Sequence, residues 1–195
     1  MSAREIWHEV PISASPSDLY EGVTDAKKLA RWWTTDTRGQ SEVGKTLEFW
    51  FGGSRAAAVM EVTVLKPQEL VQWRVVDGGA KEWTGAEIEF KIFLDEGRTF
   101  LHFRHSKWRE DAKMFPKCSM DWAVYLLSLK ELVEKGKGHP YPYDMLPHLR
   151  SPSQRTRKME PAPLGGVGPI LLHHLPAVAA PGNRILLPTD ERTRL

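Results

Sequence analysis

The sequence predicts an α+β fold in which a curved, six-stranded antiparallel sheet is covered by one long C-terminal helix. Six segments alternate between apolar and polar residues, as strands with one dry and one wet face do. A later segment instead repeats its apolar residues every three or four positions, as an amphipathic helix does. Strands in succession followed by a helix favour an antiparallel sheet over a doubly wound parallel one.

The aromatic residues divide the chain into a core-forming part and a tail. All 8 Trp, 7 Phe and 4 Tyr lie in residues 1–144, whereas residues 145–195 hold 8 of the 14 Pro and no aromatic ring. We therefore expect one domain over residues 1–144 and a Pro- and Arg-rich, disordered tail over 145–195. With 20 Lys and Arg against 22 Asp and Glu, the domain has no basic stripe, so nucleic-acid binding is not expected.

The cysteine count and the hydropathy pattern suggest a compartment. Cys118 is the only cysteine, which excludes an internal disulfide and fits a reducing environment. The N-terminus lacks the apolar core of a secretory signal, and no run of about 18 apolar residues is present to cross a bilayer. We therefore expect a cytoplasmic protein that does not insert into membranes.

Local signals define the N-terminal elements. A strand with alternating apolar residues comes first, and Ser15 and Pro16 then supply an N-cap and a first-turn proline. Of the two short helical segments that follow, the second ends in adjacent indoles, Trp32 and Trp33. The predicted bounds are 5–13 for the strand and 17–22 and 25–33 for the helical segments.

Turn signals separate the remaining five strands: glycine pairs, a Lys-Pro step and an Asp-Glu-Gly run. Alternation assigns the faces, so that Ile88 and Phe90 point to the dry side while Glu87 and Glu89 point to water. Residues 34–42 are expected to form a polar loop. The expected strands are 46–51, 57–65, 70–76, 84–94 and 98–106, and the long helix is expected over 111–135.

Two patterns have the form of nucleotide or metal motifs but lack the necessary context. Residues 39–46 satisfy the letters of a P-loop, yet a polar loop precedes them and a strand follows in place of a helix. His102 and His105 project from opposite faces of one strand, so they cannot share a metal ion. The sequence therefore predicts no catalytic residues, no metal site and no cofactor.

The residues expected between the sheet and the helix either fill a solid core or line a cavity that holds a guest. Most are aromatic, His105 could offer a ligand a hydrogen bond, and Cys118 is expected to be a buried structural thiol. The candidate lining residues are Trp32, Trp33, Phe49, Met60, Trp73, Phe90, Phe103, His105, Cys118, Trp122 and Tyr125.

Several segments together carry a family resemblance, and they are Ala14–Tyr20, Ala30–Thr34, Gly44–Phe49, Leu65–Pro67, Val71–Trp73, Phe103–Trp108 and the helix over 118–138. They resemble the START-like, birch-pollen-allergen-like superfamily called SRPBCC, and within it the bacterial homologues of the activator of the heat-shock-protein ATPase. The resemblance implies a helix-grip fold with a cavity for apolar or amphipathic small molecules between the sheet and the long helix.

The sequence is compatible with three functions. The first is binding of a small apolar molecule, oriented by His105 or Tyr125. The second is an enzyme of the cyclase or hydrolase type, in which His105 acts as general acid or base with an ordinary pKa near 6.5. The third is a chaperone-linked interaction domain. The sequence defines neither the ligand nor the oligomeric state.

Overall fold

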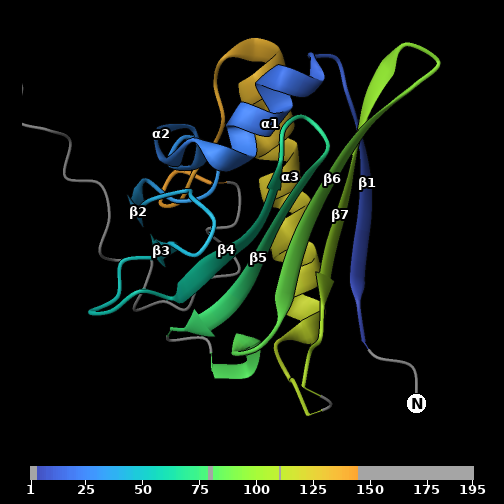
Figure 1. The fold of residues 1–195 in the computed structure, drawn as a ribbon. Helices are drawn as coiled ribbons and strands as arrows, with labels where there is room; N and C mark the ends of the chain where they lie inside the picture. Colours follow the sequence, from blue (N-terminus) through green and yellow to red (C-terminus); the bar gives the residue numbers. More distant parts are fainter. Residues whose placement is uncertain (1–3, 79–80, 110, 145–195) are drawn as a thin grey trace, which may run out of the picture. The chain divides into compact units, whose positions relative to one another are not determined.

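The computed structural model describes residues 4–78, 81–109 and 111–144 and confirms the predicted α+β fold (Figure 1). In chain order the elements are β1 (Ile6–Ile12), α1 (Pro16–Thr24), α2 (Ala26–Leu29), β2 (Asp36–Gly39), β3 (Thr46–Trp50), β4 (Ala58–Lys66), β5 (Leu70–Asp77), the 3-10 turn η1 (Lys81–Trp83), β6 (Glu87–Asp95), β7 (Arg98–Ser106) and α3 (Phe115–Lys135). The strands form one antiparallel sheet in the order β1-β7-β6-β5-β4-β3-β2, so β1 and β2 are its edges.

The prediction of six strands is wrong by one. The additional strand, β2, lies within the segment expected to be a polar loop and pairs with β3, where Arg38 faces Glu48. It has four residues and only polar or glycine side chains, so it carries no apolar alternation that sequence reading could detect. Its Arg38 guanidinium lies 4.3 Å from the centre of the Trp50 ring, which helps to hold this edge strand in place.

The longer strands follow the predicted alternation, and β4 adds curvature. Along β6 the side chains of Ile88 and Phe90 are buried, while Glu87 and Glu89 face the other side. The pairing of β4 with β5 shifts register twice, once between Val62 and Val64. Such bulges bend a strand and increase its twist, which gives the sheet a concave face that can accept a helix.

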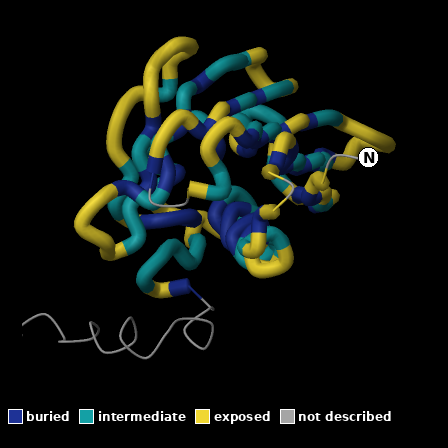
Figure 2. The backbone as a smooth tube through the Cα atoms, turned by 90° about the horizontal axis from the view of Figure 1, so that it is seen from below, coloured by how far each residue is buried: buried dark blue, intermediate teal, exposed yellow. Residues whose placement is uncertain are grey.

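The long helix packs its apolar stripe against the concave face. Buried residues recur along α3 at the predicted spacing of three and four positions, and buried residues gather in the interior in Figure 2 while the loops are exposed. The helix starts at Phe115, four residues later than predicted, with a proline in its first turn. It ends at Lys135 and is capped by Gly136, whose φ of 74° suits a glycine.

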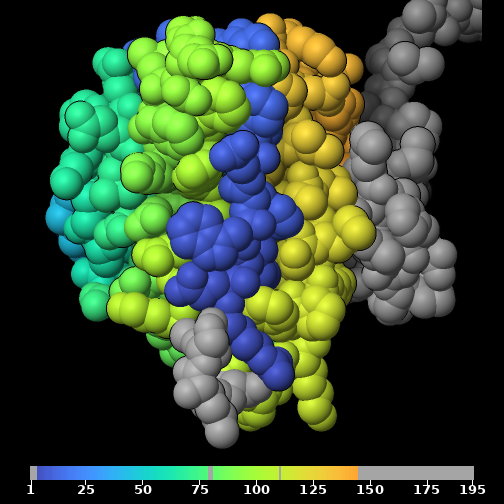
Figure 3. All heavy atoms as spheres, turned by 90° about the vertical axis from the view of Figure 1, so that its right-hand side faces the viewer, coloured from blue at the N-terminus to red at the C-terminus, as the bar shows by residue number. Residues whose placement is uncertain are grey.

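Helix α3 also covers the edge of the sheet at β1. Figure 3 shows β1 lying between the strands β6 and β7 on one side and α3 on the other. His8 Nε2 lies 3.2 Å from the carbonyl oxygen of Ser119, and Lys130 Nζ donates to the carbonyl oxygen of Pro11. The helix therefore packs beside this edge strand and pairs one of its backbone carbonyl groups, which helps to shield the edge from pairing with another strand.

A hydrogen bond from Ser128 connects the turn after α2 to α3. Helix α2 ends at Leu29, so Trp32 and Trp33 lie in a turn and not in the helix predicted over 25–33. The hydroxyl of Ser128 donates to the carbonyl oxygen of Trp32 at 2.9 Å and accepts from the backbone N–H of His139. One side chain thus joins the turn, the long helix and the segment that follows the helix.

Two further expectations concern the C-terminal tail and membrane insertion. The predicted disordered tail, residues 145–195, lies outside the described residues. Of the helices that the structure describes, none has the length and apolar character needed to cross a membrane.

Replacing Gly138 by alanine should destabilise the domain. A Cβ atom at this position would lie 2.5 Å from the carbonyl oxygen of Arg31 and 3.0 Å from that of Ser128, and both neighbours are backbone atoms. The backbone would have to shift, at a cost of about 1–3 kcal/mol in the free energy of unfolding, as overpacking usually costs. Urea denaturation of wild type and Gly138→Ala measures the loss.

The neighbouring Lys137 provides the control, because it is exposed. Lys137→Ala should leave the free energy of unfolding within about 0.5 kcal/mol of the wild-type value. Equal stability of wild type and Gly138→Ala would mean that the close approach of the two backbones is not a constraint on the fold.

Candidate functional site

The eleven residues predicted to line a cavity are brought together in one buried cluster between the concave face of the sheet and α3. Phe49, Met60, Trp73, Phe90, Phe103 and His105 come from five successive strands; Cys118, Trp122 and Tyr125 come from the helix; and Trp32 and Trp33 come from the turn after α2. Their predicted burial is therefore observed. That they line a cavity for a guest stays a prediction.

Trp33 lies at the centre of the aromatic cluster. Its ring centroid is 4.1 Å from that of Phe49 and 4.8 Å from that of Trp122, and it stacks on Trp73 at 6.3 Å with an interplanar angle of 6°. Its neighbour Trp32 donates its indole N–H to the carbonyl oxygen of Gly22 at 2.9 Å. The pair of indoles seen in the sequence therefore links α1, the sheet and α3.

His105 lies near the C-terminal end of β7, where three indoles surround it. The ring centroids of Trp108, Trp83 and Trp122 lie 4.2, 5.1 and 6.1 Å from the centroid of the imidazole. The Trp122 indole N–H donates to His105 Nδ1 at 3.0 Å, and the Trp108 N–H donates to the His105 carbonyl oxygen at 3.1 Å. The imidazole is fully buried on the dry face, as the alternation of β7 predicted.

Burial keeps this imidazole neutral. Burial desolvates the charged imidazolium and so lowers the pKa of His105 from 6.5 to about 3. The expectation of an ordinary pKa near 6.5 is therefore wrong, because the cost of desolvation depends on tertiary packing that the strand pattern does not report. A histidine with this pKa does not act as a general base near neutral pH.

Two buried N–H groups in the cluster have no acceptor among the described residues. His105 Nε2 has no hydrogen-bond partner, and neither has Nε1 of Trp73, which lies on the same cross-strand row with Ile88 between them. A third indole N–H, of Trp83, approaches the Cys118 sulfur and lowers the pKa of that thiol against the larger effect of burial, but it makes no hydrogen bond of ordinary geometry. Unpaired buried donors are rare and need a physical explanation.

Trp83 is a residue of the site that the sequence pattern does not predict. It lies outside the strand predicted over 84–94 and belongs to the short turn η1, and the strand itself begins at Glu87. A single turn has no repeating pattern, so the only available signal was an aromatic residue next to a glycine-rich break. Its ring stacks on Trp122 at 6.2 Å and faces His105 edge-on.

The remaining candidates have structural partners. Burial raises the pKa of the Cys118 thiol to about 11, which keeps it protonated and unreactive, in line with the expected structural role. The Tyr125 hydroxyl lies 3.2 Å from Oδ2 of the buried Asp144. Tyr125 is therefore engaged with the protein itself, and His105 is the better placed of the two residues proposed to orient a ligand.

Residues on the outer face behave as solvated side chains. His102 Nε2 lies 2.7 Å from Glu9, on the opposite face of β7 from His105, as predicted. Glu87 binds Lys107, and Glu89 binds Gln72 and Arg104. Among the described residues there is no group of three or more His, Cys, Asp or Glu side chains that could hold a metal ion.

The motif with P-loop letters forms a turn between two strands. It runs from the end of β2 into β3, and no helix follows it. A P-loop needs a helix N-terminus that presents backbone N–H groups to phosphate. The motif therefore has no phosphate-binding geometry.

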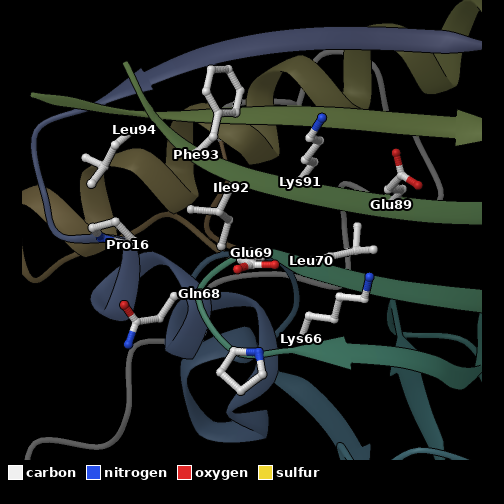
Figure 4. A pocket seen from close by; sticks show the side chains of 11 residues that line it. Pro16, Lys66, Gln68, Glu69, Leu70, Glu89, Lys91, Ile92, Phe93 and Leu94 are labelled. Atoms are coloured by element: carbon white, nitrogen blue, oxygen red, sulfur yellow. The ribbon is translucent and has the colours of Figure 1, made fainter. Parts of the chain in front are cut away.

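A surface hollow of about 780 Å³ lies where the β4–β5 turn approaches β6 and the start of α1 (Figure 4). Its lining mixes two lysines and two glutamates with apolar side chains, so it differs from the aromatic interior. The lining residues are Pro16, Lys66, Pro67, Gln68, Glu69, Leu70, Glu89, Lys91, Ile92, Phe93 and Leu94. It is a second place at which a small molecule could bind.

Comparison with known proteins identifies the group to which this arrangement is related. A family model described as Activator of Hsp90 ATPase homolog 1-like protein matches residues 13–134. The solution structure of the Aha1 dimer from Colwellia psychrerythraea is 38% identical; the match covers 69% of this chain and 99% of that chain, with a TM-score of 0.63. No curated protein matches.

More distant structures share the fold. The protein MLL2253 from Mesorhizobium loti is 18% identical over 68% of this chain and 98% of that chain, with a TM-score of 0.59. CalU16 from Micromonospora echinospora is 19% identical over 80% of this chain and 81% of that chain, with a TM-score of 0.57. At these identities the comparison supports the helix-grip architecture and nothing finer.

His105 should make the stability of the protein depend on pH. The unfolded chain takes up the proton near pH 6.5 and the folded chain near pH 3, so this stabilisation is present above 6.5 and is lost as the pH falls toward 3. Between about pH 7.5 and about pH 4.5 the loss amounts to about 2–3 kcal/mol of the free energy of unfolding. Urea denaturation at the two pH values measures it.

Two glutamine variants isolate this effect. His105→Gln has no titrating ring, so its free energy of unfolding should fall between the two pH values by about 2–3 kcal/mol less than that of the wild type. His102→Gln changes the outward side of the same strand, leaves His105 in place and should keep the full loss. Identical losses in wild type and His105→Gln would contradict the lowered pKa of the buried imidazole.

Proposed function

Because this chain belongs to the family of Activator of Hsp90 ATPase homolog 1-like proteins, as its motifs predicted, we propose that it binds a small apolar or amphipathic molecule between the sheet and α3. The family and its fold are compatible with a ligand-binding domain. The cytoplasmic location predicted from the sequence is part of this proposal.

The unpaired Nε2 of His105 is the observation that carries the proposal. A buried donor without an acceptor costs about 1–3 kcal/mol, because it has given up its hydrogen bonds to water. Its surroundings are aromatic and apolar, which is the usual lining of a small-molecule site, where a few polar groups provide orientation. A bound molecule with an acceptor atom would remove this cost.

We place the occupant next to Trp83, at one end of the aromatic cluster. In the centre of the cluster, the ring centroids of Trp33 and Phe49 are 4.1 Å apart, and those of Phe103 and Trp122 are 4.5 Å apart. No guest fits between rings at these distances. Trp83 is only half-buried and belongs to a short turn. An outward movement of Trp83 would expose His105 without displacing a strand or the long helix.

An enzyme that uses His105 as a general base receives no support from the site. The lowered pKa of His105, about 3, leaves it neutral, with Nδ1 already accepting a hydrogen bond from Trp122. The other buried nucleophile, Cys118, is held as a thiol because burial raises its pKa to about 11. Binding is therefore the simpler function for these residues.

The apolar fluorescent probe N-phenyl-1-naphthylamine should bind the full chain and quench its indole emission by energy transfer. Trp122→Phe should weaken binding about two- to tenfold, because the variant loses aromatic contact and changes the hydrogen bonding of His105. Trp7→Phe is the matched control, since Trp7 is 53% exposed on the outer face, and its dissociation constant should stay at the wild-type value. Fluorescence titration measures all three proteins.

A third variant separates the interior from the surface hollow. Leu94 lines the hollow and is 61% exposed, so Leu94→Asp should leave probe binding unchanged. Binding that is sensitive to Leu94→Asp and insensitive to Trp122→Phe would move the site to the hollow. No binding of this probe, together with no bound molecule in native mass spectra of freshly purified protein, would overturn the proposal.

A second candidate function is contact with a chaperone, which the family description suggests. A specific feature favours it: Met120 and Leu127 lie seven residues apart on α3 and are 56% and 57% exposed. Two large apolar side chains on one outward side of a helix are a common basis for docking to a partner.

If this candidate holds, the chain should stimulate ATP hydrolysis by a bacterial Hsp90 in a coupled ATPase assay. The double variant Met120→Asp, Leu127→Asp should lose most of the stimulation, because it places two charges on the exposed side of α3. Val43→Asp changes an exposed apolar residue in a loop and should retain it. No stimulation by the wild-type chain at saturating concentration would remove this candidate.

A further inference from the structure

The hydrogen bond from Trp122 determines which nitrogen of His105 carries the proton. An indole N–H can only donate, so His105 Nδ1, which receives it at 3.0 Å, must be the unprotonated nitrogen. A neutral imidazole then carries its proton on Nε2, and Nε2 is the buried atom without a partner. The site therefore presents a hydrogen-bond donor of fixed position, and it requires an acceptor.

The surroundings disfavour a charged acceptor. No Lys or Arg side chain is buried among the described residues, so none is available to neutralise a carboxylate inside the core. Burial is the largest cause that raises the pKa of the nearby Cys118 thiol, and it acts against the thiolate even though Lys117 and the Trp83 N–H favour it, so the interior opposes negative charge mainly by desolvation. The desolvation that keeps His105 neutral would penalise a buried carboxylate in the same way.

We infer that the bound molecule is an uncharged aromatic or alicyclic compound whose carbonyl oxygen accepts a hydrogen bond from His105 Nε2. This inference rests on the proposed function and specifies its ligand class. The ring body of the ligand lies against Trp83 and Trp108, and its carbonyl points to β7. Carboxylates of the same shape are rejected because they would be buried without a cation.

Three naphthalenes with a three-atom substituent test the inference with the full chain: 2-acetylnaphthalene, 2-isopropylnaphthalene and 2-naphthoate. Their dissociation constants follow from titrations observed by indole fluorescence or by NMR. The ketone should bind at least about tenfold more tightly than the carboxylate, because only the ketone can be buried uncharged. Equal or tighter binding of naphthoate would overturn the inference.

The contribution of His105 is measured as a change in preference between the ketone and the hydrocarbon. His105→Phe keeps an aromatic ring and removes the donor, so the affinity ratio of ketone to hydrocarbon should fall about tenfold from its wild-type value. His105→Gln places an amide N–H near the position of Nε2 and should recover part of the ratio. An unchanged ratio in His105→Phe would overturn the inference.

A measurement on the wild-type chain does not depend on how the variants fold. With ¹⁵N-labelled histidine, the Nε2 proton of His105 should move downfield when 2-acetylnaphthalene is added and stay in place with 2-isopropylnaphthalene. Binding of the hydrocarbon without any response to the ketone would overturn this inference while the proposed function stands. If none of the three compounds binds while N-phenyl-1-naphthylamine does, the inference is overturned and the proposed function stands. If that probe also fails to bind and native mass spectra show no bound molecule, both are overturned.

Discussion

The architecture of the described domain depends on the packing of two indoles, Trp33 and Trp122, between the curved sheet and α3. Neither the sheet nor the helix can bury its dry face alone. The concave sheet and the helix meet through these two rings, whose centroids are 4.8 Å apart. Each close aromatic pair contributes about 0.5–1.5 kcal/mol beyond the area that it buries. Trp33 comes from the turn after α2, so the short helices are needed to complete the core as well as to connect two strands.

The same packing decides which chemistry the interior permits. Trp122 donates to His105 and closes the imidazole off from water, and this desolvation is what lowers the pKa of His105 to about 3. A side chain often associated with proton transfer becomes a neutral hydrogen-bond donor. The nearby thiol is held in its protonated form for the same reason, because burial raises the pKa of Cys118 to about 11. Aromatic enclosure thus favours binding over acid–base or nucleophilic chemistry.

Sequence pattern alone predicted the parts of the fold in which side chains alternate. The faces of β6 and β7 follow from period two, and so does the opposite placement of His102 and His105. The bounds of β2 and the role of Trp83 did not follow, because a polar edge strand of four residues and a single 3-10 turn have no period to detect. The lowered pKa of His105 depends on which rings surround it, and only the tertiary structure brings together residues as distant as Trp83 and Trp122.

The surface hollow and the aromatic interior differ in how much folding stability their polar groups cost the protein. In the surface hollow, charged residues remain near water, and Glu89 has Gln72 and Arg104 as partners. In the interior, His105 follows Leu101 and Phe103 on the dry face of β7, and a third apolar residue there would avoid the unpaired N–H. That N–H costs about 1–3 kcal/mol out of a net stability of about 5–15 kcal/mol typical of domains. Proteins accept local instability of this size mainly at functional sites, and this difference in cost is the physical reason for proposing the interior, and not the hollow, as the binding site.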